Sequence, residues 1–291
     1  MCGIVGYVGQ RSASEVVLGG LARLEYRGYD SAGIAIVVPG NSLVSRKKAG
    51  KLSVLRDELE ANPLAQGTTG IGHTRWATHG PPTDANAHPH LADGGKLALI
   101  HNGIIENFDE LKSELQAQGE QFHSDTDSEV AAVMLGRAFH ETQDLTLAMR
   151  AVVARLEGAF TLLGVHQDQP DVVVGARRNS PLVVGLGQGE NFLGSDVAAF
   201  VAYTDKAMAL GQDQIVTITP DSVTITTFEG DPATAAQFDI DWDASAADKG
   251  GWSSFMAKEI SEEPEAVANT LRGRISPEGT VTLPDLDSLL D

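Results

Sequence analysis

The chain has 291 residues, which is enough for one large domain or two small ones. Its 40 acidic and 21 basic residues give a formal net charge of −19, which argues against a nucleic-acid or anionic-membrane partner, because both need a basic surface. No apolar run approaches the ~18–20 residues of a membrane span and no charged-then-apolar leader opens the chain, so we expect a cytoplasmic protein.

The N-terminal third is predicted to alternate apolar strands with a helix. Val17, Leu21 and Leu24 repeat at helical spacing, and Ser12 with Glu15 predicts a capping box at the start of that helix. Apolar runs bounded by glycine or polar residues predict strands over residues 3–8, 33–38, 71–75 and 97–101.

Helices dominate the middle of the chain and strands return after it. Helices are predicted over residues 107–118, 128–140 and 145–156. Strands are predicted over residues 160–165, 172–177, 182–187, 215–219 and 223–228. This order favours sheets layered with helices over a strict alternation of strand and helix.

The character of the sequence changes near residue 230. Residues 231–248 are rich in Ala and Asp and are typical of a surface segment or linker. A helix is predicted over residues 256–271, interrupted at Pro264. Residues 275–291 do not resemble the end of a compact domain.

The chain has a single cysteine, at position 2, so no intrachain disulfide can form. Met1 precedes this small residue and is expected to be removed, which would leave Cys2 with both a thiol and a free α-amine. An α-amine has a pKa of ~7.7–8.0 against ~10.4 for lysine, and a base works best when its pKa is near the operating pH. One residue can therefore supply nucleophile and base, as N-terminal threonines do. The alternative is an incidental second residue.

Donors for a negatively charged intermediate are predicted at Asn102 and Gly103, which follow His101 at the end of an apolar strand. A thiolate that attacks a carboxamide creates an oxyanion, which needs preorganised donors. Asn102 supplies a side-chain amide and Gly103 a backbone N–H. The alternative is an ordinary Asn-Gly turn.

Charged side chains at two other positions suit the ends of an amino acid. Arg75 can bind an α-carboxylate with its planar guanidinium. Asp127 can accept from an α-ammonium, or alternatively it caps the helix that begins there. Trp76 and residues 78–82 suggest a mobile flap with an aromatic lid, with a plain surface loop as the alternative.

Several of these stretches together resemble the class II glutamine amidotransferases, which belong to the N-terminal nucleophile hydrolases. The stretches are residues 2–6 (Cys-Gly-Ile-Val-Gly), 73–80 (His-Thr-Arg-Trp-Ala-Thr-His-Gly) and 101–107 (His-Asn-Gly-Ile-Ile-Glu-Asn). Residues 24–33 and the motifs within 255–274 resemble the branch of this family that aminates fructose 6-phosphate. The resemblance covers nearly the whole chain.

The resemblance implies an α+β fold, a four-layer αββα sandwich over residues 2–240. Residues 241–291 would form a linker that leads to sugar-isomerase domains absent from this chain. The implied reaction forms a γ-glutamyl thioester on Cys2, releases glutamate from L-glutamine and passes on ammonia, which the full-length enzyme would use to convert fructose 6-phosphate to glucosamine 6-phosphate. No cofactor or metal is implied, and the full-length enzyme would be a homodimer.

Roles at the reacting carbon follow from the same resemblance. Asn102 and the backbone amide of Gly103 would form the oxyanion hole. Arg27 would lie near the nucleophile and help to position its loop.

Roles at the rest of the substrate also follow from the resemblance. Arg75 would bind the glutamine carboxylate, with help from Thr78 and His79 in the same loop. Asp127 would bind the α-amine, and Trp76 would move as a lid over the substrate.

Three alternatives remain open. The first is another class II amidotransferase, such as the purine-pathway amidophosphoribosyltransferase or asparagine synthetase, against which residues 25–33 and the C-terminal motifs argue. The second is an inactive regulatory domain, which would result if Met1 stayed attached and kept the Cys2 amine in a peptide bond. The third is a metal-binding module built on four histidines that lack cysteine partners and compact ligand spacing. These are His73, His79, His88 and His90.

Overall fold

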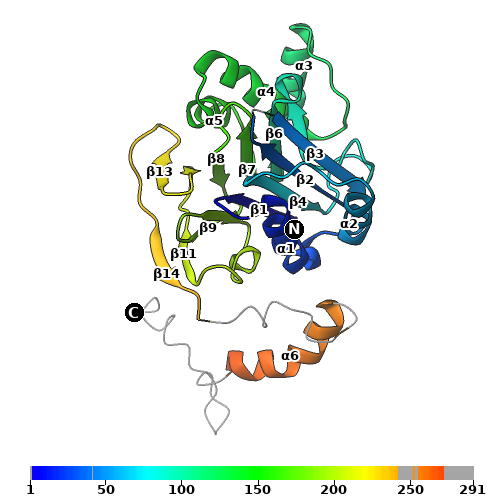
Figure 1. Ribbon diagram of the computed structural model, residues 1–291, viewed down its shortest axis with the longest axis vertical. Helices are drawn as coiled ribbons and strands as arrows, with labels where there is room; N and C mark the ends of the chain where they lie inside the picture. Colours follow the sequence, from blue (N-terminus) through cyan, green and yellow to red (C-terminus); the bar gives the residue numbers. More distant parts are fainter. Residues whose placement is uncertain (1, 41, 242–251, 253–254, 272–291) are drawn as a thin grey trace, which may run out of the picture. The chain divides into compact units, whose positions relative to one another are not determined.

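The computed structural model describes residues 2–40, 42–241, 252 and 255–271 (Figure 1). The chain divides into two compact units, Met1–Ala244 and Ser245–Asp291. The first unit holds two antiparallel sheets and all the residues of the predicted site.

One sheet has eight strands. In spatial order they are β14 (Ala236–Asp239), β11 (Lys206–Ala209), β9 (Val183–Leu186), β10 (Asn191–Gly194), β1 (Gly3–Val8), β4 (Thr69–Arg75), β2 (Ser31–Val38) and β3 (Ser42–Ala49).

The other sheet has six strands. In spatial order they are β13 (Val223–Thr227), β12 (Gln214–Ile218), β8 (Val173–Arg178), β7 (Gly158–His166), β6 (Leu97–Ile105) and β5 (His90–Ala92).

Helices cover the outer face of each sheet (Figure 1). The eight-stranded sheet carries α1 (Ala13–Arg23) and α2 (Leu52–Ala61). The six-stranded sheet carries α4 (Asp127–Thr142) and α5 (Leu145–Val153), with α3 (Phe108–Ala117) packed on α4. Short 3₁₀ turns lie at η1 (Glu25–Arg27), η2 (Asp93–Gly95) and η3 (Val197–Ala199).

Strand β6 shows how the layers arise from the sequence. Its side chains alternate between the two faces of the sheet. Leu97 and Leu99 pack in the apolar cluster under the helices, whereas Ala98 and Ile100 pack in the cluster between the two sheets. A strand buried on both faces reads as a continuous apolar run. The predicted four-layer αββα sandwich is therefore confirmed.

Two predictions about element ends are wrong. Strand β6 does not stop at residue 101 but continues to Ile105, because Asn102 and Gly103 stay in register with Thr161 and Phe160 of β7. Helix α1 has no capping box, since Ser12 makes no side-chain bond to a helical N–H and its Oγ lies 3.1 Å from that of Ser14 instead.

The segment predicted as a surface segment or linker over residues 231–248 contains the exposed edge strand β14, which pairs with β11. Residues 242–248 of that segment lie outside the described residues. In the second unit α6 (Phe255–Leu271) runs without a break through Pro264, so the predicted interruption there is wrong. None of the helices in the described ranges combines the length and apolar character of a membrane-spanning segment.

Candidate active site

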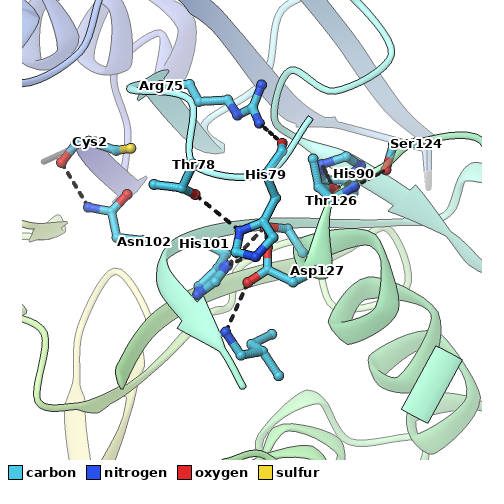
Figure 2. Close-up of polar contacts among 12 residues, drawn as sticks. Cys2, Arg75, Thr78, His79, His90, His101, Asn102, Ser124, Thr126 and Asp127 are labelled. Atoms are coloured by element: carbon cyan, nitrogen blue, oxygen red, sulfur yellow. Dashed lines mark hydrogen bonds and ion pairs between the residues drawn. The ribbon is translucent and has the colours of Figure 1, made fainter. Parts of the chain in front are cut away.

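A cavity of 390 Å³ lies where β1 begins, β4 ends and β6 passes the two. All the residues that the sequence predicted for the site line it. They are Cys2, Arg27, Arg75, Trp76, Thr78, His79, Asn102, Gly103 and Asp127. Figure 2 shows the Asn102 amide turned toward Cys2, the Arg75 guanidinium turned toward His79, and Asp127 beside His101.

Cys2 lies directly before β1, and its thiol contacts the backbone of Trp76. The Trp76 N–H donates to Sγ at 3.1 Å, and Sγ lies 3.5 Å from the Trp76 carbonyl oxygen. Burial raises the pKa of the Cys2 thiol above its ordinary value, although the Trp76 N–H and the nearby Arg75 oppose this shift. Burial thus favours the neutral thiol, which needs a base before it can attack. Met1 lies outside the described residues.

Asn102 is buried on β6 and connects the two sheets. Its Nδ2 donates to the backbone carbonyl of Cys2 at 2.8 Å, and its Oδ1 lies 2.9 Å from Nε2 of His73 on β4. The amide is thus held at both ends beside the thiol.

Gly103 has φ +122°, a conformation that other residues rarely adopt. A Cβ at this position would lie 2.0 Å from the backbone oxygen of Ala159 on β7. The close pairing of β6 and β7 therefore requires glycine here. Because β6 continues through Asn102 and Gly103, the alternative of an Asn-Gly turn is wrong.

Arg75 is the last residue of β4 and is 3% exposed. Its guanidinium donates to the carbonyl oxygens of His79, Gly80 and Pro81, the last two at 3.4 Å. The predicted flap is thus folded back onto the predicted carboxylate-binding group. Within it, Thr78 Oγ1 and His79 Nδ1 lie 3.4 Å apart.

Asp127 is the first residue of α4, and its carboxylate is tied to β6. Oδ2 accepts from the Ile105 N–H at 2.9 Å, and Oδ1 accepts from Ser128 Oγ at 3.3 Å. The N-cap residue of α4 is Thr126, so the alternative of Asp127 as a helix cap is wrong. A buried carboxylate therefore faces the cavity near the N-terminus of a helix.

Trp76 and Arg27 lie at the rim of the cavity. The Trp76 side chain is 47% exposed and contacts Tyr29 edge to face, with ring centroids 5.5 Å apart. Arg27 forms an ion pair with Asp196 at 2.6 Å and donates from Nε to the Tyr26 hydroxyl at 3.0 Å. Arg27 therefore lines the cavity, but its described side-chain bonds are to Asp196 and Tyr26 and not to the Cys2 thiol.

The histidines of the metal-binding alternative do not all converge. His88 packs against His73 with ring centroids 4.1 Å apart and the rings tilted by 31°, and it meets His90 edge to face at 4.8 Å. His79 instead contacts Phe108. Among the described residues, no group of three or more His, Cys, Asp or Glu side chains is arranged to hold a metal ion.

Several cavity residues were not predicted as part of the site. His101 Nδ1 lies 2.9 Å from Ser128 Oγ, which in turn donates to Asp127. His101 precedes Asn102 and Ser128 follows Asp127. Their position next to predicted site residues was therefore the sequence signal that could have identified them. Ser180 and Pro181 also line the cavity, yet they follow β8 with no recognisable motif.

A family model described as a glutamine amidotransferase domain matches residues 56–226. The chain is 67% identical, over 100% of its length, to a protein of Leifsonia xyli subsp. xyli named glutamine–fructose-6-phosphate aminotransferase [isomerizing], of which it covers 47%. It is 59% identical, over 98% of its length, to a protein of the same name from Streptomyces coelicolor, of which it covers 46%. The chain thus spans about half the length of the curated relatives it matches.

Solved structures with the same architecture include glutamine phosphoribosylpyrophosphate amidotransferase from B. subtilis in complex with ADP and GMP. The match has a TM-score of 0.68 and 27% sequence identity, and it covers 78% of this chain and 49% of that one.

Proposed function

The chain belongs to the glutamine amidotransferases, and from that premise we propose that it hydrolyses L-glutamine to L-glutamate and ammonia through a thioester on Cys2. The observation that carries the proposal is the single cavity in which the Cys2 thiol, the Asn102 amide and the charged groups of Arg75 and Asp127 meet. A neutral thiol suits an uncharged carboxamide. Two fixed protein groups of opposite charge suit the two charged ends of a zwitterionic amino acid.

The first half of the proposed reaction forms the thioester. Once Met1 is removed, the Cys2 α-amine accepts the thiol proton, and the thiolate attacks the carboxamide carbon of glutamine. The Asn102 Nδ2–H and the Gly103 N–H stabilise the oxyanion that develops. The amine then returns the proton to the leaving nitrogen, so that the C–N bond breaks and ammonia departs.

The second half consumes one water. The Cys2 amine takes a proton from water, which attacks the thioester carbon, and the same two donors stabilise the second oxyanion. The C–S bond breaks, the proton passes to sulfur, and glutamate leaves. One glutamine and one water yield one glutamate and one ammonia.

Each charged end of glutamine would bind to a protein side chain of opposite charge. We assign its carboxylate to Arg75, with Thr78 and His79 beside it, and its α-ammonium to Asp127. Charge-assisted hydrogen bonds of this kind are stronger than neutral ones. The guanidinium contacts with the flap carbonyls couple the carboxylate site to the flap. Trp76 would close over the substrate, and Arg27 would support the loop near the nucleophile.

The role in a longer protein is a second part of the proposal. Residues 2–240 would be the glutaminase domain, and residues 241–291 a linker to sugar-isomerase domains that this chain does not contain. The relatives' name supports transfer of the ammonia to fructose 6-phosphate. We propose in addition that the product is glucosamine 6-phosphate and that the longer protein is a homodimeric cytoplasmic enzyme. Identities of 67% and 59% to these two relatives, against 27% to the phosphoribosylpyrophosphate amidotransferase structure, favour this acceptor over phosphoribosylpyrophosphate.

Glutamate release from purified chain lacking Met1 tests the glutaminase proposal. We expect steady turnover of L-glutamine, and little turnover of L-asparagine, whose amide falls one methylene short of Cys2 when both charged ends are held. A processed, folded chain that releases no glutamate would contradict the proposal.

A further inference from the structure

The orientation of the Asn102 amide is determined by the groups around it. A backbone carbonyl only accepts hydrogen bonds, so the atom 2.8 Å from the Cys2 oxygen is the amide nitrogen. The amide oxygen therefore faces His73, whose Nε2 lies 2.9 Å away. Because that oxygen also only accepts, His73 must carry a proton on Nε2.

His73 is a rigid and uncharged donor. It lies in the middle of the eight-stranded sheet, where β4 pairs it with Ile4 of β1 and Gly33 of β2. The side chain is buried and packs against the ring of His88. Burial lowers the pKa of His73 to about 3, so the imidazole stays neutral at any pH suitable for a thiol reaction.

The oxyanion site depends on which way the amide of Asn102 faces. The oxygen and nitrogen ends of a carboxamide have nearly the same shape, so hydrogen bonds decide between them. A reversed amide would present its oxygen to the developing negative charge and oppose the reaction. With Nδ2 on the reacting side, one N–H serves the Cys2 carbonyl and the second can serve the oxyanion.

We propose that His73 is a positioning residue for glutamine hydrolysis, because its Nε2–H holds the oxygen of Asn102 and thereby keeps the amide nitrogen facing the reacting carbon. The inference rests on the proposed function. His73 acts only through Asn102, does not touch glutamine and takes no proton.

A matched pair of variants separates the hydrogen bond from the ring. His73→Gln and His73→Met have side chains of similar length, but only glutamine retains an N–H donor. We expect His73→Met to lower kcat by about 10- to 10²-fold with KM nearly unchanged, and His73→Gln to recover much of that loss. Equal kcat values for the two variants would overturn the inference. If both variants melt below the assay temperature, His73→Phe is compared with the wild-type chain instead. Phenylalanine retains a ring but has no hydrogen-bond donor.

A double-mutant cycle with Asn102→Ala supplies the decisive comparison. If His73 acts through Asn102, then His73→Met adds no further loss once Asn102 is alanine. Losses that multiply would show that His73 serves the fold or the substrate independently and would overturn the inference. The wild-type chain is assayed alongside: its turnover of glutamine tests the proposed function, so an active wild type with multiplicative losses contradicts the positioning role alone.

Discussion

Asn102 Nδ2 donates a 2.8 Å hydrogen bond to the backbone carbonyl of Cys2, although the two residues are 100 positions apart in the chain. The bond joins the residue before β1 to the middle of β6, and so it crosses from one sheet to the other. The proposed nucleophile and the proposed oxyanion donor are therefore held at a fixed separation by the two packed sheets.

Replacement of Asn102 by alanine removes the proposed oxyanion donor and leaves the groups proposed to bind the ends of the substrate in place. We expect kcat to fall about 10²–10³-fold with little change in KM. Steady-state kinetics of glutamate release measure both constants. A rise in KM at unchanged kcat would instead make Asn102 a substrate-binding residue.

Replacement of Gly103 by alanine combines an unfavourable φ with a collision against Ala159. A left-handed conformation alone costs about 1–2 kcal/mol for a residue with a Cβ. Gly119→Ala is the control, because Gly119 has φ +94° and nothing within 4 Å of the added atom. We expect Gly103→Ala to lower the melting temperature more than Gly119→Ala, and only Gly103→Ala to abolish activity. Equal effects on melting would show that β6 and β7 can separate.

Replacement of Arg75 by lysine retains the charge but loses the planar fork that reaches several flap carbonyls and the proposed carboxylate. Hydrogen bonds to charged groups contribute about 1.5–3 kcal/mol, so KM for glutamine should rise roughly 10- to 100-fold. Arg56→Lys, on the exposed face of α2, should leave KM unchanged. An unaltered KM in Arg75→Lys would place the carboxylate elsewhere.

The buried histidines should make the fold sensitive to mild acid. Burial lowers the pKa of His73 to about 3, and it lowers those of His88, His90 and His101. Above pH ~6.5 these rings are neutral in both the folded and the unfolded chain. Below it only the unfolded chain takes up the protons, so the free energy of unfolding falls by up to about 1.4 kcal/mol per pH unit for each ring.

Urea unfolding at pH 7 and pH 5.5 measures this dependence before the carboxylates titrate. His88→Phe removes one of these rings and should therefore make the free energy of unfolding depend less steeply on pH. Neither ring nitrogen of His88 has a hydrogen-bond partner among the described residues, so the substitution removes no hydrogen bond there. His140→Gln, on the exposed end of α4, should leave the slope unchanged. Equal free energies of unfolding at the two pH values in the wild-type chain would contradict the prediction.

The layered architecture was predictable from the sequence because strands such as β6 are buried on both faces and appear as apolar runs. Strand β3 was missed for the opposite reason. It is partly exposed and carries Arg46, Lys47 and Lys48 in a row, so it has no apolar alternation. The edge strand β14 was not predicted within its surface segment or linker, because its residues are exposed and its pairing with β11 joins distant parts of the chain.

The place of a residue in the site was predictable where its residue type has few other roles at that position. Cys2 and Arg75 are examples, and both line the cavity. The continuation of β6 through Asn102 and Gly103 was not predictable, because only the register with β7 shows that this Asn-Gly pair is no turn. The presence of Ser180 in the cavity wall was not predictable for a similar reason, because only tertiary packing brings it there.

The role of Cys2 is tested most directly by comparing the processed wild-type chain with Cys2→Ala in a glutamine-to-glutamate assay, with intact mass spectrometry on both samples to verify the loss of Met1. We predict turnover by the wild type, none by Cys2→Ala at an unchanged melting temperature, and none by any fraction that retains Met1. Glutamate release by Cys2→Ala near the wild-type rate would contradict a thioester on Cys2.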